Sequence, residues 1–129
     1  MIELIRDNWN GRINDEQTIK EPSLSRVIGF LDALDQDKRT SFSITIDSCK
    51  SLTVGGGLGK YVVYVTDEDG NFHSLTNDDA LDGTIMINIG GQEGDYDQGI
   101  VVNKTVASEV IEVFISSEKL DPRYVWECN

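Results

Sequence analysis

The sequence has few of the residues on which several classes of function depend. Its 129 residues include two cysteines, two prolines and one histidine. Cys49 and Cys128 have no CxxC spacing and no neighbouring histidine, so we expect two reduced, unrelated thiols and no metal site. The one histidine, His73, stands beside Phe72 in a predicted strand, and no Ser or Cys occupies a nucleophile elbow. We therefore predict a protein that is not an enzyme.

Long hydrophobic segments are also missing. No apolar run approaches the roughly 20 residues that a bilayer-spanning helix needs. The first residues, MIELIRDNWNGR, lack the basic and apolar regions of a secretory signal. No linker or repeat interrupts the chain. We expect one soluble domain, residues 1–129, with one hydrophobic core and a location in the cytoplasm.

Positive charge is absent from a long internal stretch. The formal net charge is −12, and residues 61–103 contain no Lys or Arg. The acidic residues of this stretch are Asp67, Glu68, Asp69, Asp78, Asp79, Asp82, Glu93, Asp95 and Asp97. Such a field repels nucleic acid and anionic membranes and attracts basic protein surfaces, although excess acid can also serve solubility alone. We favour a basic protein partner, and expect neither nucleic acid nor membrane as a partner.

Two segments have helical periodicity. Apolar residues recur at i, i+3, i+4 and i+7 from about residue 23 to 35, after a Pro-Ser pair that is typical of a helix start. Asn103 is the expected cap of a second helix at about 104–119, with Lys119 in its last turn and Pro122 ending it.

The remaining segments alternate in hydrophobicity as β-strands do. We predict strands at residues 41–47, 51–54, 60–66, 71–76, 84–90 and 100–102, a turn at 67–70, loops at 77–83 and 91–99, and a last short strand or tail at 123–127. This order implies an α+β fold, in which a mostly antiparallel twisted sheet packs against two helices.

The segment LTVGGGLGKYVVYV, residues 52–65, invites comparison with a phosphate-binding loop. The Walker A spacing fails, because Val54 stands where the first glycine is needed and Tyr61 replaces the magnesium-binding hydroxyl. A phosphate loop also leads into a helix, whereas these glycines lead into a predicted strand. We therefore expect a bend between strands and no cofactor. The acidic segments likewise lack the spacing of an EF-hand calcium loop.

Several segments in chain order are similar to one known family. The early helix is followed by LTVGGG at 52–57, NIGG at 88–91, a helix containing Phe114, and VWE at 125–127 after Pro122. From about residue 24 to its C-terminus the chain resembles the Imm1 family of immunity proteins from bacterial polymorphic toxin systems. The resemblance implies a non-enzymatic inhibitor that binds the C-terminal toxin domain of a secreted effector, often a nuclease or a nucleic-acid deaminase.

Charge and loop placement supply the candidate contacts, because the family's motif does not mark them. We assign toxin binding to the nine acidic residues named above, with Tyr96 as an aromatic anchor. A small-ligand-binding or adaptor domain without a toxin partner is the alternative. The ligand-binding version needs a polar pocket near Gly55 and Gly59 with Lys60 pointing into it.

Overall fold

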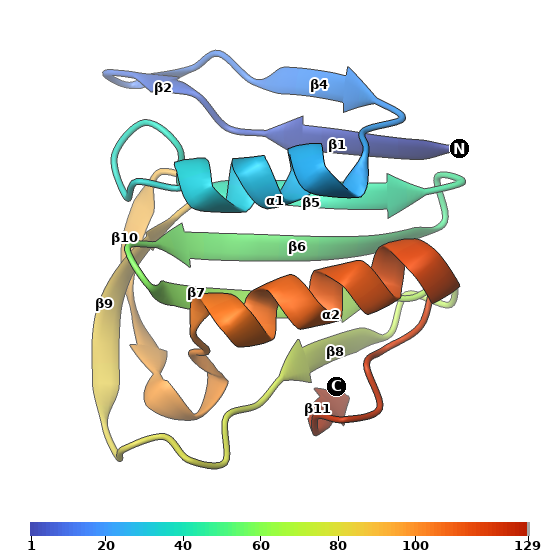
Figure 1. The fold of residues 1–129 in the computed structure, drawn as a ribbon. Helices are drawn as coiled ribbons and strands as arrows, with labels where there is room; N and C mark the ends of the chain where they lie inside the picture. Colours follow the sequence, from blue (N-terminus) through green and yellow to red (C-terminus); the bar gives the residue numbers. More distant parts are fainter. Residues whose placement is uncertain (129) are drawn as a thin grey trace.

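The computed structural model describes residues 1–128 and contains one small α+β domain with a large antiparallel sheet, as the sequence predicts. In chain order the elements are β1 (Ile2–Arg6), β2 (Trp9–Asn10), β3 (Ile13–Asn14), β4 (Gln17–Lys20), α1 (Leu24–Ala33), β5 (Ser41–Ile46), β6 (Lys50–Gly57), β7 (Lys60–Thr66), β8 (Phe72–Leu75), β9 (Thr84–Ile89), β10 (Gln92–Asp97), the 3-10 helix η1 (Gln98–Ile100), α2 (Lys104–Ser117) and β11 (Trp126–Cys128). Seven strands form the sheet in the order β11-β8-β7-β6-β5-β1-β4, and both helices lie on one face of it (Figure 1).

The two helices begin where the sequence predicts. The Ser23 hydroxyl accepts a hydrogen bond from the Arg26 backbone N–H at 3.2 Å. The Asn103 side chain accepts one from the Val106 N–H at 2.9 Å. Each cap satisfies a backbone donor that has no partner inside its helix.

The second helix ends within two residues of its expected end, but the expected place of Lys119 in its last turn is wrong. The helix stops at Ser117, because Glu118 adopts a left-handed conformation (φ 59°) and donates its N–H to the Phe114 carbonyl at 2.8 Å. Lys119 therefore lies outside the last turn, and Pro122 plays no part in ending the helix.

The N-terminal strands were not predicted. β1 pairs with both β4 and β5, so the first 20 residues extend the sheet by two strands. The buried Asp7 carboxylate fixes the end of β1 by accepting hydrogen bonds from the Thr40 N–H at 2.7 Å and from the Trp9 indole N–H at 2.8 Å. The strands β1 to β4 are short, and β2 and β3 contain only two residues each, so the sequence shows little periodicity there.

Residues 91–99, predicted as a loop, instead contain the strand β10, which pairs with β9 in an antiparallel hairpin. The turn contains Gly90 and Gly91 at φ 66° and 81°, the signs that a two-residue type I′ turn needs. The predicted strand at 100–102 is also wrong. Its first residue belongs to η1, and only Val102 pairs, through an isolated bridge to Tyr61.

A glutamine side chain ties the hairpin β9–β10 to the loop after α1. The Gln36 amide nitrogen donates to the Asn88 carbonyl at 2.7 Å, and its oxygen accepts from the Asn88 N–H at 2.7 Å. The Gln36 side chain thus pairs with Asn88 as the backbone of a neighbouring strand would.

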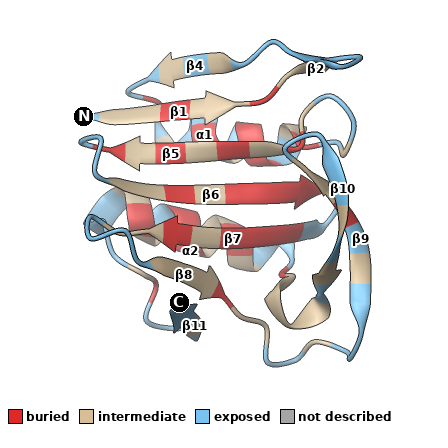
Figure 2. Cartoon of the chain, turned by 180° about the vertical axis from the view of Figure 1, so that it is seen from behind, coloured by how far each residue is buried: buried red, intermediate tan, exposed pale blue. Residues whose placement is uncertain are grey.

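The main core lies between the sheet and the helices. Its fully buried members include Leu4, Ile44, Val63, Leu31 and Ile111. Figure 2 shows this burial concentrated on the central strands and the inner sides of the helices, while the hairpin β9–β10 is exposed or intermediate except at the buried Ile87.

A smaller apolar contact holds the hairpin on the sheet. Ile89 of β9 packs over Gly55, where a Cβ would lie 2.5 Å from the Ile89 Cγ2 atom. Gly57 is covered in the same way, because a Cβ there would lie 2.7 Å from the Leu34 carbonyl oxygen. Both glycines therefore permit close packing of the chain.

The glycine-rich segment is the bend that the sequence predicts. Leu58 (φ 56°) and Gly59 (φ 88°) form the two-residue turn between β6 and β7, and both have the positive φ of a type I′ turn. Lys60 is exposed at the start of β7.

Neither helix within residues 1–128 is long and apolar enough to cross a membrane.

Candidate functional site

The acidic residues predicted to bind a partner fall into two separate groups. Residues 67–69 form the turn between β7 and β8, at the right of the sheet in Figure 1. Residues 78–97 lie at the opposite end, in the loop before β9 and in β10. The structure therefore does not bring all nine carboxylates onto one surface.

The first group is largely engaged within the protein. The Asp67 carboxylate contacts the His73 ring nitrogen at 3.0 Å and accepts hydrogen bonds from the backbone N–H groups of Asp69 and Asn71. The His73 hydrogen bond is the largest cause that lowers the pKa of Asp67 to about 2, from a usual value of 3.8. Glu68 pairs with Lys50 at 3.4 Å. His73 thus has a structural partner, and Asp67 and Glu68 stabilise the turn.

The second group is exposed. Its members are Asp78, Asp79, Asp82, Glu93, Asp95 and Asp97. Within residues 1–128 none of these six takes part in an ion pair of 4.0 Å or less. Asp97 has one local role, since it accepts a hydrogen bond from the Gly99 N–H at 2.7 Å.

The alternation of side chains along β10 places Glu93, Asp95 and Asp97 on the outer face of the hairpin. The cross-strand partner of Asp95 is Met86, which is 56% exposed. Leu81, in the loop between the acidic residues, is 77% exposed. We define the acidic surface as these eight residues: Asp78, Asp79, Leu81, Asp82, Met86, Glu93, Asp95 and Asp97.

Tyr96 lies on the other face of the hairpin from Asp95 and Asp97, and its expected role as an aromatic anchor stays a prediction. It alternates with Asp95 and Asp97, and its cross-strand partner is Ile85, on the same face as the buried Ile87. Met86 and Leu81 are the large apolar side chains on the acidic surface. Sequence reasoning missed Met86 because the partner strand β10 was expected to be a loop.

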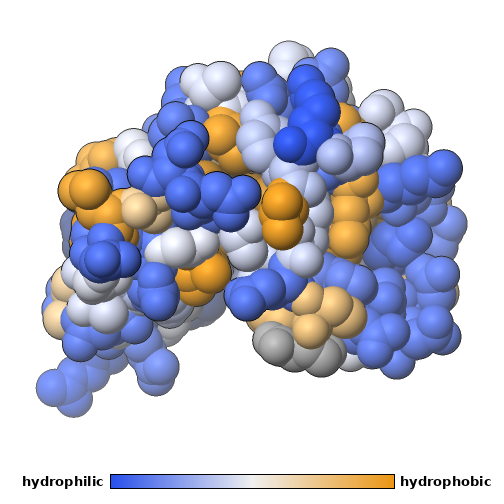
Figure 3. All heavy atoms as spheres, turned by 90° about the horizontal axis from the view of Figure 1, so that it is seen from below, coloured by the Kyte–Doolittle hydropathy of each residue, from blue (hydrophilic) through white to orange (hydrophobic). Residues whose placement is uncertain are grey.

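The hydropathy of the side chains around the acidic surface can be seen in a view from below. Figure 3 shows mostly hydrophilic side chains over the left part of the molecule, where residues 77–83 and the lower end of the hairpin lie in Figure 1, with isolated hydrophobic ones among them. Exposed apolar side chains scattered singly are normal on protein surfaces, so the excess of negative charge is what distinguishes this region.

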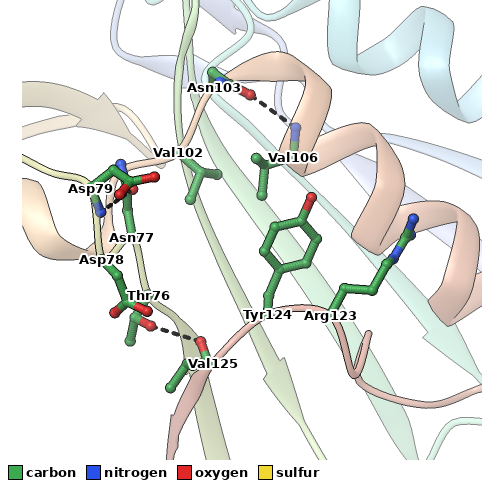
Figure 4. A pocket seen from close by; sticks show the side chains of 10 residues that line it. All are labelled: Thr76, Asn77, Asp78, Asp79, Val102, Asn103, Val106, Arg123, Tyr124 and Val125. Atoms are coloured by element: carbon green, nitrogen blue, oxygen red, sulfur yellow. Dashed lines mark hydrogen bonds between the residues drawn. The ribbon is translucent and has the colours of Figure 1, made fainter.

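A pocket of about 320 Å³ adjoins the acidic surface (Figure 4). It lies between residues 76–79, the start of α2 and residues 123–125, and Asp78 and Asp79 line it together with Tyr124. The Tyr124 hydroxyl donates a hydrogen bond to Glu109, and this bond is the largest cause that raises the pKa of Tyr124.

The C-terminal wall of this pocket is held by an ion pair between a buried aspartate and an exposed arginine. The completely buried Asp121 accepts from the Arg123 guanidinium, with an Oδ2–Nη2 distance of 2.7 Å. This hydrogen bond holds the pKa of Asp121 below its usual value. The Trp126 indole N–H donates to the Asp121 carbonyl at 3.1 Å, so this tryptophan has a structural role.

Metal chemistry has no evident support in the described part of the chain. Among residues 1–128, no group of three or more His, Cys, Asp or Glu side chains is arranged to hold a metal ion. The glycine-rich segment, where the ligand-binding alternative needs a pocket, is covered at two of its glycines. Ile89 fills the space above Gly55, and the Leu34 carbonyl fills the space above Gly57.

No protein-family model matches this chain, and no curated protein matches it.

Proposed function

We propose that this protein binds a basic protein partner and neutralises it by covering its functional cleft. The partner that fits the resemblance to Imm1 immunity proteins is the C-terminal toxin domain of a secreted effector. A nuclease or a nucleic-acid deaminase needs a basic cleft for its substrate, and an acidic protein can occupy that cleft. On this proposal the protein acts in the cytoplasm of the cell that it protects, without catalysis.

The observation that supports the proposal is the acidic surface itself. Six exposed carboxylates lie within 20 residues of sequence, with no ion pair to any of them inside residues 1–128. Met86 and Leu81 are exposed among them. Side chains that are neutralised inside the protein have little charge left for a partner, whereas these six retain theirs.

The same surface argues against the other classes of macromolecule. Phosphate groups of nucleic acids and anionic lipids would be repelled by it. A neutral adaptor surface would not need an excess of one charge.

The test first looks for a large secreted effector encoded directly upstream of this protein's gene, and then co-expresses the C-terminal domain of that effector with this protein. We expect the cells to survive and the two proteins to purify together, with a complex that weakens as salt rises. If the cells die and no complex forms, the proposal is wrong.

A pair of matched variants locates the interaction. The first variant carries Asp78→Lys, Asp79→Lys, Glu93→Lys and Asp95→Lys, all on the acidic surface. The control has the same change in net charge at exposed positions elsewhere, namely Glu16→Lys, Asp69→Lys, Glu112→Lys and Glu127→Lys. We expect the first variant to lose protection and the control to keep it. Equal loss in both would show that net charge, and not this surface, drives binding.

A further inference from the structure

The pocket beside the acidic surface has walls of different chemistry. Asp78 and Asp79, both exposed, come from one side, and the Tyr124 ring faces them from the other (Figure 4). Val102 and Val106 supply apolar lining between these two sides. Carboxylates, an aromatic face and an aliphatic wall are together the surroundings that favour a long cationic side chain.

The walls are fixed before any ligand arrives. Thr76 donates to the Val125 carbonyl through both its backbone N–H (3.0 Å) and its hydroxyl (2.8 Å). The Asn77 N–H donates to Gly99 at 2.7 Å and its side-chain amide to Val101 at 2.9 Å. The Tyr124 ring is oriented by its hydrogen bond to Glu109. A pocket that is already ordered loses little conformational entropy when it binds.

The cation nearest to the pocket cannot serve its two carboxylates. Arg123 lines the pocket, but its guanidinium is held by the buried Asp121 at 2.7 Å and lies 3.7 Å from Glu109. Removing it would leave the Asp121 carboxylate buried without its cation, which is strongly unfavourable. Asp78 and Asp79 therefore remain available to a cation from outside.

We infer that this pocket receives one cationic side chain of the partner, arginine in preference to lysine. The aliphatic stem would lie along Val102 and Val106, and the charged group between the carboxylates and the Tyr124 ring. Arginine is preferred because its planar guanidinium can stack on the ring and donate to both carboxylates at once. That the side chain belongs to a toxin domain rests on the proposed function. The pocket's preference for a cation does not rest on it.

The direct test follows the amide NMR signals of the ¹⁵N-labelled protein during titration with N-acetyl-arginine amide. We expect the largest shifts at residues 76–79 and at Val125, which line the pocket. N-acetyl-citrulline amide has nearly the same shape without the charge and is the matched ligand. Equal shifts from citrulline, or arginine shifts centred elsewhere, would overturn the inference.

Two double variants distinguish binding in the pocket from attraction by the protein's overall negative charge. Asp78→Asn with Asp79→Asn should weaken arginine amide binding by about threefold or more, from the loss of two exposed ion pairs. Glu93→Gln with Asp95→Asn removes the same charge from residues that do not line the pocket, and should change binding by less than about 1.5-fold, since exposed charges at a distance are screened by salt. All four positions are exposed, so both variants should fold. Equal weakening in the two variants would mean that no specific site exists.

The outcomes distinguish this inference from the proposed function. If the toxin domain binds and is neutralised but arginine amide does not shift the pocket signals, the inference fails while the proposed function stands. If arginine amide binds in the pocket as expected but no toxin complex forms, the proposed function fails while the pocket remains a site for cations.

Discussion

The turn between β7 and β8 and the segment from residue 78 to 97 both contain closely spaced carboxylates, but they meet different surroundings. In the turn, Asp67 is bonded to His73 and two backbone N–H groups, and Glu68 faces Lys50. In the 78–97 segment, six carboxylates are exposed and take part in no ion pair within residues 1–128. A carboxylate that is satisfied inside the protein contributes to stability, whereas an exposed one contributes to the external field.

The exposed acidic residues of β10 keep their position only while the hairpin β9–β10 stays packed on the sheet. Replacing Gly55 with valine forces Ile89 away, because the added Cβ would lie 2.5 Å from its Cγ2 atom. We expect the free energy of unfolding to fall by about 1–3 kcal/mol, as for other overpacked sites. Urea unfolding would measure this loss, and hydrogen exchange should show lower protection in the hairpin than in the β7–β8 turn.

Ser51→Val is the matched control for that experiment. Ser51 lies on the same strand and the same face as Gly55, at the end remote from the β6–β7 turn, and is only partly buried. It should leave stability nearly unchanged. If the two variants unfold alike, the contact between Ile89 and Gly55 does not hold the hairpin.

Within the acidic surface, the apolar and charged side chains should have separable roles. Met86→Ala should weaken the complex with the toxin domain by about 1–2 kcal/mol, mainly through faster dissociation, because exposed apolar anchors supply affinity on burial. Surface plasmon resonance would separate the two rate constants. Ile13→Ala, at a residue that is 70% exposed on β3, is the control and should have no effect. A slower association with unchanged dissociation in Met86→Ala would contradict this role.

The two acidic groups can be compared directly by their effect on association. Glu93→Lys with Asp95→Lys should slow association with the toxin domain by about three- to tenfold at low salt, since steering depends on charges at the interface. Glu68→Lys with Asp69→Lys changes the net charge equally, yet should slow association less than about twofold. Stopped-flow measurement at two salt concentrations would show whether position matters. Equal rates for the two variants would remove the distinction between the groups.

The smallest expected effect is the pH dependence of the turn. Because the folded-state pKa of Asp67, about 2, is below its usual value of 3.8, its contribution to stability is present above pH 3.8 and is lost as the pH falls through 2. Asp67→Asn should therefore be less stable than the natural protein at pH 6, and the difference should shrink towards pH 2. Urea titrations of the two proteins at a series of pH values would measure this difference. A constant difference in Asp67→Asn would mean that the carboxylate charge does not matter to the turn.

Local patterns in the sequence predict about half of this architecture. The two helices and strands β5 to β9 were predicted because periodicity and capping residues act over short distances. Strand β10 was missed because QEGDYD has no apolar alternation, and its extended form depends on pairing with β9. Gly90 and Gly91 next to an apolar strand were the available signal, since such a pair favours a two-residue hairpin turn.

The candidate site was less predictable than the fold. The sequence identified every acidic residue, but it could not show that Asp67 faces His73, which depends on how the strands β7 and β8 pair. The exposure of Met86 and the inward direction of Tyr96 both follow from the register of β9 against β10. A change of one residue in that register would have exchanged their faces.

The pairing of Gln36 with Asn88 has a consequence for behaviour at high concentration. A strand edge with unsatisfied N–H and carbonyl groups can recruit the same strand from another molecule and begin ordered aggregation. The Gln36 amide occupies both groups of Asn88 at the edge of β9, at 2.7 Å each. A single side chain thereby closes this one position of β9 to intermolecular β-pairing.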